Sequence, residues 1–218
     1  MRFLIIILFL LFSEALLAQS KVVNDPYENG LIKDGFKEGT WEYYDEPGKL
    51  SLKINYDSSK LLFLKQDTSE YVIQAGNQWV KEKLDRQPRY IGSMNDFHKL
   101  EKIARYPADA LNNNTCGKLY ITFEVDTSGK AGNYQIINDI GDHCGDEIAG
   151  LLKVLPNYWL PAQKDGQLYA AKFMLPVLFK MIIDGKEIKP KKDIPIASIP
   201  FAKELPVMIV KVAAVSKK

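Results

Sequence analysis

The sequence predicts an α+β fold, in which a β-hairpin meander precedes a small antiparallel sheet with two helices. The segment KLYITFEVDTSGKAGNYQIIND has two alternating strands, 119–125 and 134–138, joined by a turn rich in Asp, Ser and Gly. The segment DEIAGLLKVLPNYW then predicts a helix that ends at Pro156. Upstream, residues 29–65 alternate short apolar runs with Gly, Asp, Asn and Ser, which is typical of a meander. The apolar face of the predicted helix consists of Ile148, Leu151, Leu152 and Leu155.

Composition allows one medium domain or two small ones. The chain has 218 residues, of which 46% are hydrophobic, and this is ordinary for a globular protein with a core. The 29 basic and 27 acidic residues give a net charge of +2. No overall charge therefore favours nucleic acid or an anionic membrane as a partner.

The first 20 residues, MRFLIIILFLLFSEALLAQS, predict a secretory signal peptide. Arg2 gives the basic start, 3–12 the apolar run, and Ala18 the small residue before cleavage. A retained inner-membrane anchor is the competing interpretation, but a spanning helix needs about 20 apolar residues and Glu14 interrupts this one. We therefore expect cleavage after Ala18 and export to the periplasm.

Export would place the two cysteines, Cys116 and Cys144, in an oxidising compartment. Two cysteines in a secreted chain more often pair than stay free, so a disulfide is expected between them. The chain-entropy model assigns such a crosslink about 3 kcal/mol of stabilisation. Two unpaired cysteines are the alternative.

The first half carries aromatic residues at strand spacing. In TWEYYDEPGKLSLKINY, Trp41 and Tyr43 share one strand face, and DEPGK supplies a turn before the next strand. A further hairpin is predicted over 71–80. The segment DGFKEGTWEYYDEPGKLSLKINY resembles the MORN-like repeats of exported bacterial proteins, since it has their Gly-x-Trp-x-x-Tyr pattern followed by a Gly-Lys-Leu turn. The resemblance covers about one repeat.

The second half begins with two short helical segments and ends with an unusual strand. MNDFHKLEKIA has Met94, Phe97, Leu100 and Ile103 at helical spacing, with Ser93 or Asn95 as the cap. YPADALNN predicts one or two helical turns opened by Pro107. In KFMLPVLFKM, 172–181, an apolar strand contains Pro176. Because proline has no N–H for a sheet ladder, this strand is expected at a sheet edge or with a bulge.

Four segments in this order, YPADA, GKLYITFEVDTSGK, DEIAGLLKVLPNYWLPAQKDGQ and LPVLFKM, resemble the TonB C-terminal domain family. The preceding RQPRYIGSMNDFHKL is similar to the lead-in of many Bacteroidetes-type members. The resemblance implies that the last strand lies at the edge of a small antiparallel sheet and binds an extended peptide, such as the TonB box of an outer-membrane receptor, by strand addition. It also implies that Trp159 locks the preceding crossover onto the sheet. The partner-binding residues that it implies are Lys172, Phe173, Leu175, Val177 and Phe179.

The predicted function is therefore that of an exported, soluble protein-binding module. A membrane-anchored TonB-type energy transducer for outer-membrane transport is the alternative, but the expected signal is cleavable and a long Pro-rich span is lacking. A cysteine-dependent enzyme is a third hypothesis. The predicted division is a signal peptide at 1–18, a MORN-like segment at 19–85, a TonB C-terminal-like domain at 86–184 and an apolar, basic tail at 185–218.

The tail contains LPVMIVKV, 205–212, which is similar to LPVLFKMI at 175–182. An exposed apolar strand is a liability unless it pairs or is covered. One hypothesis is that 207–212 adds to the sheet edge, in the same chain or in a neighbour, and so blocks or replaces the peptide partner. Packing of this strand elsewhere in the fold is the other.

The residues that would suggest catalysis or metal binding have simpler interpretations. His143 stands next to Cys144, but sequence neighbours usually point apart, whereas a catalytic pair meets through the fold. Asp142 and Asp146 lie near a predicted helix start, where negative charge interacts favourably with the helix dipole. This explains the two residues more simply than a metal site does. No phosphate loop, Cys-x-x-Cys set or Gly-x-Ser-x-Gly motif is present. The sequence therefore predicts no catalytic, metal or cofactor site and no enzyme activity.

Overall fold

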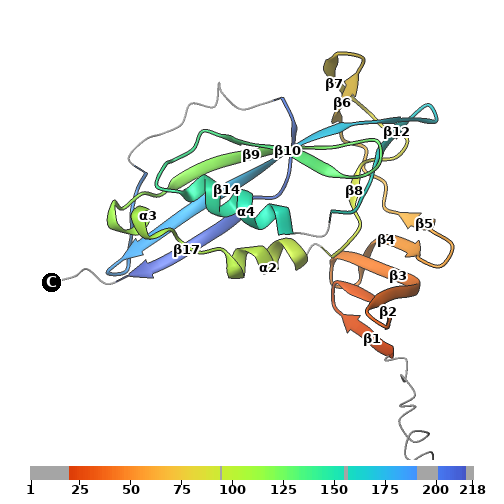
Figure 1. The fold of residues 1–218 in the computed structure, drawn as a ribbon, viewed down its shortest axis with the longest axis horizontal. Helices are drawn as coiled ribbons and strands as arrows, with labels where there is room; N and C mark the ends of the chain where they lie inside the picture. The colour runs from red at the N-terminus through yellow and green to blue at the C-terminus, as the bar shows by residue number, and fades with distance from the viewer. Residues whose placement is uncertain (1–19, 94, 155–156, 191–200, 215–218) are drawn as a thin grey trace, which may run out of the picture. The chain divides into compact units, whose positions relative to one another are not determined.

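The computed structural model describes residues 20–93, 95–154, 157–190 and 201–214 (Figure 1). The chain divides into two compact units, and the division falls between Leu64 and Lys65. The expected signal peptide at 1–18 lies outside the described residues, as do Met94 and Leu155. Among the described residues, no helix is long and apolar enough to cross a membrane.

The first unit is a five-stranded antiparallel meander in which each strand pairs with the next along the chain. Trp41 and Tyr43 stack with ring centroids 6.1 Å apart and are buried with Leu52 and Ile54 from the neighbouring strand. The aromatic spacing noted in the sequence therefore builds the core of this sheet. The strands are β1 (Ser20–Asp25), β2 (Glu28–Lys33), β3 (Phe36–Glu46), β4 (Lys49–Asn55) and β5 (Lys60–Leu64).

The second unit is built on a larger sheet around one long strand, β14 (Ala171–Ile183). Hydrogen bonds connect it in the order β10–β9–β14–β6–β7, with β15, β16 and β17 also paired to β14. Two further antiparallel pairs lie outside this sheet: the hairpin of β12 with β13, and β8 with β11, which are far apart in the sequence. The strands are β6 (Tyr71–Ala75), β7 (Gln78–Glu82), β8 (Arg89–Tyr90), β9 (Gly117–Val125), β10 (Ala131–Ile137), β11 (Trp159–Leu160), β12 (Ala162–Lys164), β13 (Gln167–Tyr169), β15 (Lys186–Glu187), β16 (Lys203–Glu204) and β17 (Met208–Ala214).

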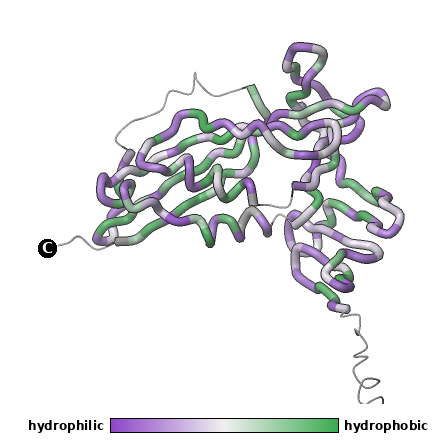
Figure 2. The backbone as a smooth tube through the Cα atoms, in the orientation of Figure 1, coloured by the Kyte–Doolittle hydropathy of each residue, from purple (hydrophilic) through white to green (hydrophobic). Residues whose placement is uncertain are grey.

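The described helices are α2 (Asn95–Ile103), α3 (Ala108–Asn112) and α4 (Cys144–Val154), and they match the three helical segments of the sequence. Their buried residues, Leu100, Ala110, Ile148 and Leu152, form one cluster with side chains from β9, β14 and β17. The helices therefore cover one face of the large sheet. The strands beneath them are the most hydrophobic part of the second unit (Figure 2).

The prediction of a small α+β fold with two helices is wrong. The described structure is mostly antiparallel sheet, with three helices and several sheets. The physical reason is the length of β14: its 13 residues offer two long edges, and five other strands pair along them. Three of these partners, β15, β16 and β17, come from the tail, and a fourth, β6, precedes the described helices.

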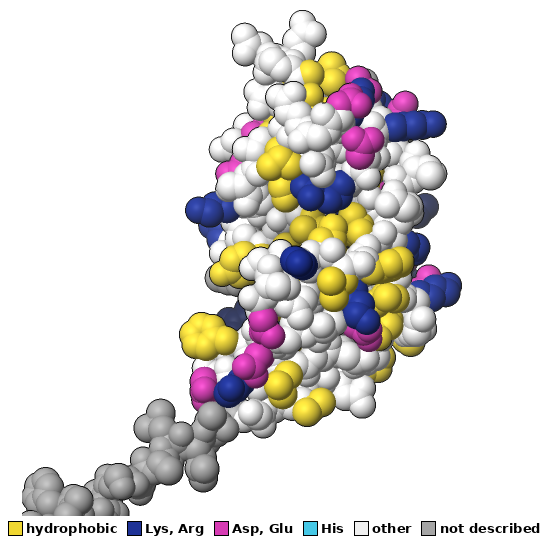
Figure 3. Space-filling model, turned by 90° about the vertical axis from the view of Figure 1, so that its right-hand side faces the viewer, with side chains coloured by type: hydrophobic (Ala, Val, Ile, Leu, Met, Phe, Trp, Pro, Cys, Tyr) yellow, Lys and Arg dark blue, Asp and Glu magenta, His cyan; other side chains and the backbone are white. Residues whose placement is uncertain are grey.

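The division between the units differs from the expected one at residue 85. Ala171 and Lys172 of β14 pair with Ile73 and Val72 of β6, and β6 forms a hairpin with β7. The segment 65–85 therefore belongs to the sheet of the second unit. On the face shown in Figure 3, charged side chains of both signs are interspersed with apolar ones, in keeping with the near-zero net charge.

Candidate functional site

The five residues predicted to bind a partner all lie on β14, but four of their side chains are buried. Phe173, Leu175, Val177 and Phe179 are each at most 2% exposed and belong to the core of the second unit. Lys172 points to the opposite face, where its Nζ lies 3.2 Å from Glu124 and 4.1 Å from the ring centroid of Trp79. With the tail in place, these four apolar side chains are therefore out of a ligand's reach.

Both backbone edges of β14 are paired. On one side, residues 171–179 run antiparallel to β9. The other side is covered in succession by β6 at 171–172, β16 at 173–174 and β17 at 177–183. The edge expected to receive a peptide thus holds the tail of the same chain, as Figure 1 shows for β17 beside β14.

Pro176 marks a gap in the tail-side pairing. The carbonyl of Met174 accepts a hydrogen bond from the N–H of Leu205 at 2.8 Å, so even-numbered residues of β14 direct their backbone groups toward the tail. Pro176 has no N–H to offer there, and the pairing stops after Met174 and resumes at Val177. The proline therefore divides this edge into a short β16 section and a longer β17 section.

β17 is held mainly by alternate apolar side chains. Met208 and Val210 are 5% and 1% exposed, and they stand opposite Val177 and Phe179 in a parallel register. Ile209, between them, is 41% exposed, and its N–H donates to a carboxylate oxygen of Glu101 on α2 at 3.1 Å. One face of β17 is therefore core, whereas the other is open to solvent.

β16 is held by a cluster of polar side chains. The ammonium of Lys203 donates to the hydroxyl of Ser69, lies 3.9 Å from a carboxylate oxygen of Asp67, and sits 4.5 Å from the ring centroid of Tyr71. Burial raises the pKa of Asp67, but hydrogen bonds from Ser69 and Tyr71 and the charge of Lys203 outweigh it and bring the pKa down to about 2. Burial and the Asp67 carboxylate raise the pKa of Tyr71. The carboxylate is therefore ionised and the phenol protonated at neutral pH.

The expected disulfide is not formed in the structure. Cys116 and Cys144 are both buried thiols, and the thiol of Cys116 donates a hydrogen bond to the carbonyl oxygen of Ile188 at 3.4 Å. Burial and the charges of Asp139 and Asp142 raise the pKa of Cys144 to about 12. Cys144 therefore stays protonated at neutral pH, a state that is unsuited to a nucleophile.

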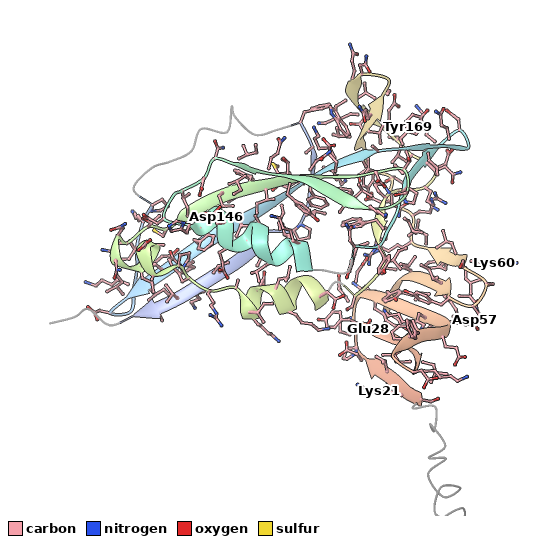
Figure 4. The ribbon with its side chains drawn as sticks, in the orientation of Figure 1. Lys21, Glu28, Asp57, Lys60, Asp146 and Tyr169 are labelled. Carbon is pink, nitrogen blue, oxygen red and sulfur yellow. The ribbon has the colours of Figure 1, made fainter. Side chains whose placement is uncertain are left out.

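His143 lies outside the core, with 69% of its side chain exposed. It pairs with Asp109 at 3.5 Å and with Asp146 at 3.3 Å; Asp146 is labelled at the start of α4 in Figure 4. The preceding Asp142 accepts hydrogen bonds from Asn113 and Thr115, which anchors the loop before β9. In the described part of the chain, no group of three or more His, Cys, Asp or Glu residues could hold a metal ion. The side chain of His98 lies outside the described residues.

Sequence reasoning found the strand of this site but missed the residues that hold the tail to it. Asp67, Ser69, Glu101 and Lys203 carry no motif and come from three distant parts of the chain. The one available signal was the similarity between LPVLFKMI and LPVMIVKV, which indicated the tail but not its attachments.

Comparison with known proteins gives no independent assignment of this site. No protein-family model, no curated protein and no solved structure matches the chain. The resemblances to the TonB C-terminal domain family and to MORN-like repeats therefore rest on the quoted segments alone. What the protein does must be argued from the edge of β14 and the tail that covers it.

Proposed function

We propose that the protein is an exported, periplasmic protein-binding module that captures an extended peptide by strand addition to the tail-side edge of β14. The single observation that carries this proposal is the parallel pairing of β17 over 177–183. A terminal segment of the chain occupies the edge in the way an added peptide would, through main-chain hydrogen bonds and alternate side chains. The tail then acts as a built-in competitor of the partner.

The strength of the tail's attachment is compatible with exchange. Burial of Met208 and Val210 contributes about 1.5–3 kcal/mol for each side chain, and each ladder hydrogen bond adds a net of about 0.5–1.5 kcal/mol. The entropy of ordering the tail opposes these terms by about 1–2 kcal/mol per residue. A peptide that buries equivalent side chains recovers the same contacts, but it must also compete with the effective concentration of the tethered tail, so it displaces the tail only when its own contacts are stronger or the tail is weakened.

The register between β14 and β17 predicts which side chains such a peptide needs. Met208 and Val210, opposite Val177 and Phe179, enter the core beside the helices, and Val212, opposite Met181, is half-buried. The residues between them face solvent, as Ile209 and Lys211 do. The partner is therefore an extended segment with at least three apolar residues at alternate positions.

A binding measurement with the full mature chain tests this function. The probe is a labelled synthetic peptide with the sequence of residues 201–214, and the variant is Met208→Ala with Val210→Ala, which weakens the chain's own β17. The matched control is Ile209→Ala with Lys211→Ala, which changes only the outward face. We expect the first variant to bind the peptide at least about tenfold more tightly than the control, since a loss of 1.4 kcal/mol corresponds to that factor. Absence of peptide binding by both variants, with circular dichroism unchanged, would exclude strand exchange at β14.

A further inference from the structure

Asp67, Ser69 and Tyr71 together contact the ammonium of Lys203 beside the start of β14, and this set of three residues is here called the Asp67 pocket. It receives the ammonium of Lys203 through a hydrogen bond to Ser69, an ion pair with Asp67 and the face of the Tyr71 ring. The hydroxyl accepts a hydrogen bond from the ammonium, the carboxylate supplies the opposite charge, and the aromatic face provides a cation–π contact. The pocket is therefore complementary to a cationic side chain.

The pocket is organised without the help of its occupant. The Tyr71 hydroxyl donates to one carboxylate oxygen of Asp67 at 2.6 Å, and the N–H of Ser69 donates to the other at 2.8 Å. The ring of Tyr71 is only 6% exposed and packs edge-on against Phe173, with centroids 6.4 Å apart. None of these contacts involves Lys203, so both groups are held by other residues, and a preorganised site binds more tightly because less ordering is needed.

The pocket also opens to solvent. The side chains of Lys203 and Asp67 are 25% and 40% exposed. A lysine from another chain can therefore reach the carboxylate, whereas a fully buried ion pair would not be accessible to it.

Its position on the sheet connects the pocket to the strand-addition edge. Lys203 stands opposite Phe173, and the first residue of β17, Met208, stands opposite Val177. Lys203 thus precedes Met208 by five positions along the tail, whereas the residues opposite them on β14 are four positions apart. The tail has one extra residue in the segment beside Pro176, where the ladder is interrupted. A peptide that replaces the tail would bring the residue at this spacing into the Asp67 pocket.

We propose that the Asp67 pocket is a specificity site for a lysine of the partner peptide, located five residues before the alternating apolar run that pairs with β14, as Lys203 is before Met208. This assignment rests on the proposed function. In the structure, Lys203 occupies the site as the tail's substitute for that lysine. The partner is then an extended segment that carries a lysine at a fixed distance before its alternating apolar residues, and not any apolar extended segment.

The test uses the full mature chain with Met208→Ala, Val210→Ala and Lys203→Gln, the last of which removes the chain's own lysine from the Asp67 pocket. Two synthetic peptides of residues 201–214 are compared, one with its native lysine and one with Lys203→Gln. We expect the lysine peptide to bind about tenfold more tightly, as is typical of a hydrogen bond and ion pair with a charged group. Adding Asp67→Asn should remove the difference between the peptides. Glu70→Gln, which removes a neighbouring exposed carboxylate, is the matched control and should preserve it.

The outcomes separate this inference from the proposed function. Equal binding of both peptides to the chain with an intact pocket would overturn the pocket assignment and leave strand addition standing. Absence of binding by either peptide would overturn the proposed function and the partner assignment with it.

A second measurement needs no added peptide. In the otherwise native chain, amide exchange at Val210 should accelerate with Lys203→Gln and with Asp67→Asn, and the double variant should be no faster than either single one. Additive effects would show that Asp67 does not recognise the lysine, and would overturn the assignment.

Discussion

Gly129 and Trp159 meet through their backbones in the second unit. The N–H of Trp159 donates to the carbonyl of Gly129 at 2.9 Å, and Gly129 has φ +80°. A Cβ at this position would overlap the carbonyl oxygen of Trp159. The ring of Trp159 in turn lies 5.1 Å from Phe173 and 5.7 Å from Phe123, between centroids. The β9–β10 turn thus positions the tryptophan over the end of the sheet.

Gly129→Ala should therefore reduce the free energy of unfolding by at least about 2 kcal/mol, because strain at positive φ adds to the overlap with Trp159. Urea unfolding followed by circular dichroism measures this loss. Gly166→Ala is the matched control: its φ is +76°, and a Cβ there meets nothing within 4 Å. It should cost only about 1 kcal/mol. Equal losses at both glycines would contradict the role given to Trp159.

The first unit contains a lysine held by its aromatic core. The Nζ of Lys37 lies 4.0 Å from the ring centroid of Trp41 and donates to the hydroxyl of Tyr43 at 2.7 Å. Lys37→Met keeps the apolar stem but removes the charge, so we expect a loss of about 1–2 kcal/mol in the unfolding of this unit. Lys60→Met, at an exposed residue labelled in Figure 4, is the control and should change stability by less than about 0.5 kcal/mol. No difference between the two variants would show that the aromatic contact adds nothing.

Local patterns in the sequence were sufficient to predict most individual elements. The hairpin of β9 and β10 follows from alternation around DTSGK, and α4 follows from apolar residues at helical spacing before Pro156. Trp41 and Tyr43 are buried on one strand face as their spacing predicts. These features depend on residues that are close together in the sequence, so they can be predicted without knowledge of the fold.

The arrangement of the sheet could not be predicted in the same way. Nothing within 171–183 indicates that β14 is central. Its apolar composition shows that its side chains are buried, but it does not show whether one or both of its backbone edges are paired. Pro176 suggested an edge or a bulge, whereas the structure accommodates it by a gap between β16 and β17. Likewise, the Asp67 pocket unites Ser69 with Lys203 across 134 positions of sequence, and no local pattern reports such a contact.

Cys144 should be unreactive in the folded protein. Its thiol is buried and its pKa is raised to about 12, so the thiolate needed for alkylation is scarce at pH 7.5. With reduced protein, we expect negligible labelling by iodoacetamide in the native state and modification of both cysteines after addition of urea. Mass spectrometry of the peptides that contain Cys116 and Cys144 measures each site separately. Native labelling of Cys144 at the rate of a free cysteine would revive the hypothesis of a cysteine-dependent enzyme.

The fold of the second unit should lose stability in acid because of Asp67. The folded-state pKa of this carboxyl is about 2, below the ordinary value of about 3.9 in an unfolded chain. The unfolded state therefore binds the proton first, so the contribution of Asp67 to stability is complete above about pH 4 and is lost as the pH falls toward 2. Urea unfolding between pH 5 and pH 2.5, followed by circular dichroism, should show a free energy of unfolding that declines over this range. Asp67→Asn, which has no carboxyl to titrate, should flatten that decline, whereas Glu70→Gln should leave it unchanged. A decline of equal steepness in the Asp67→Asn variant would mean that other carboxyls control the acid sensitivity of the fold.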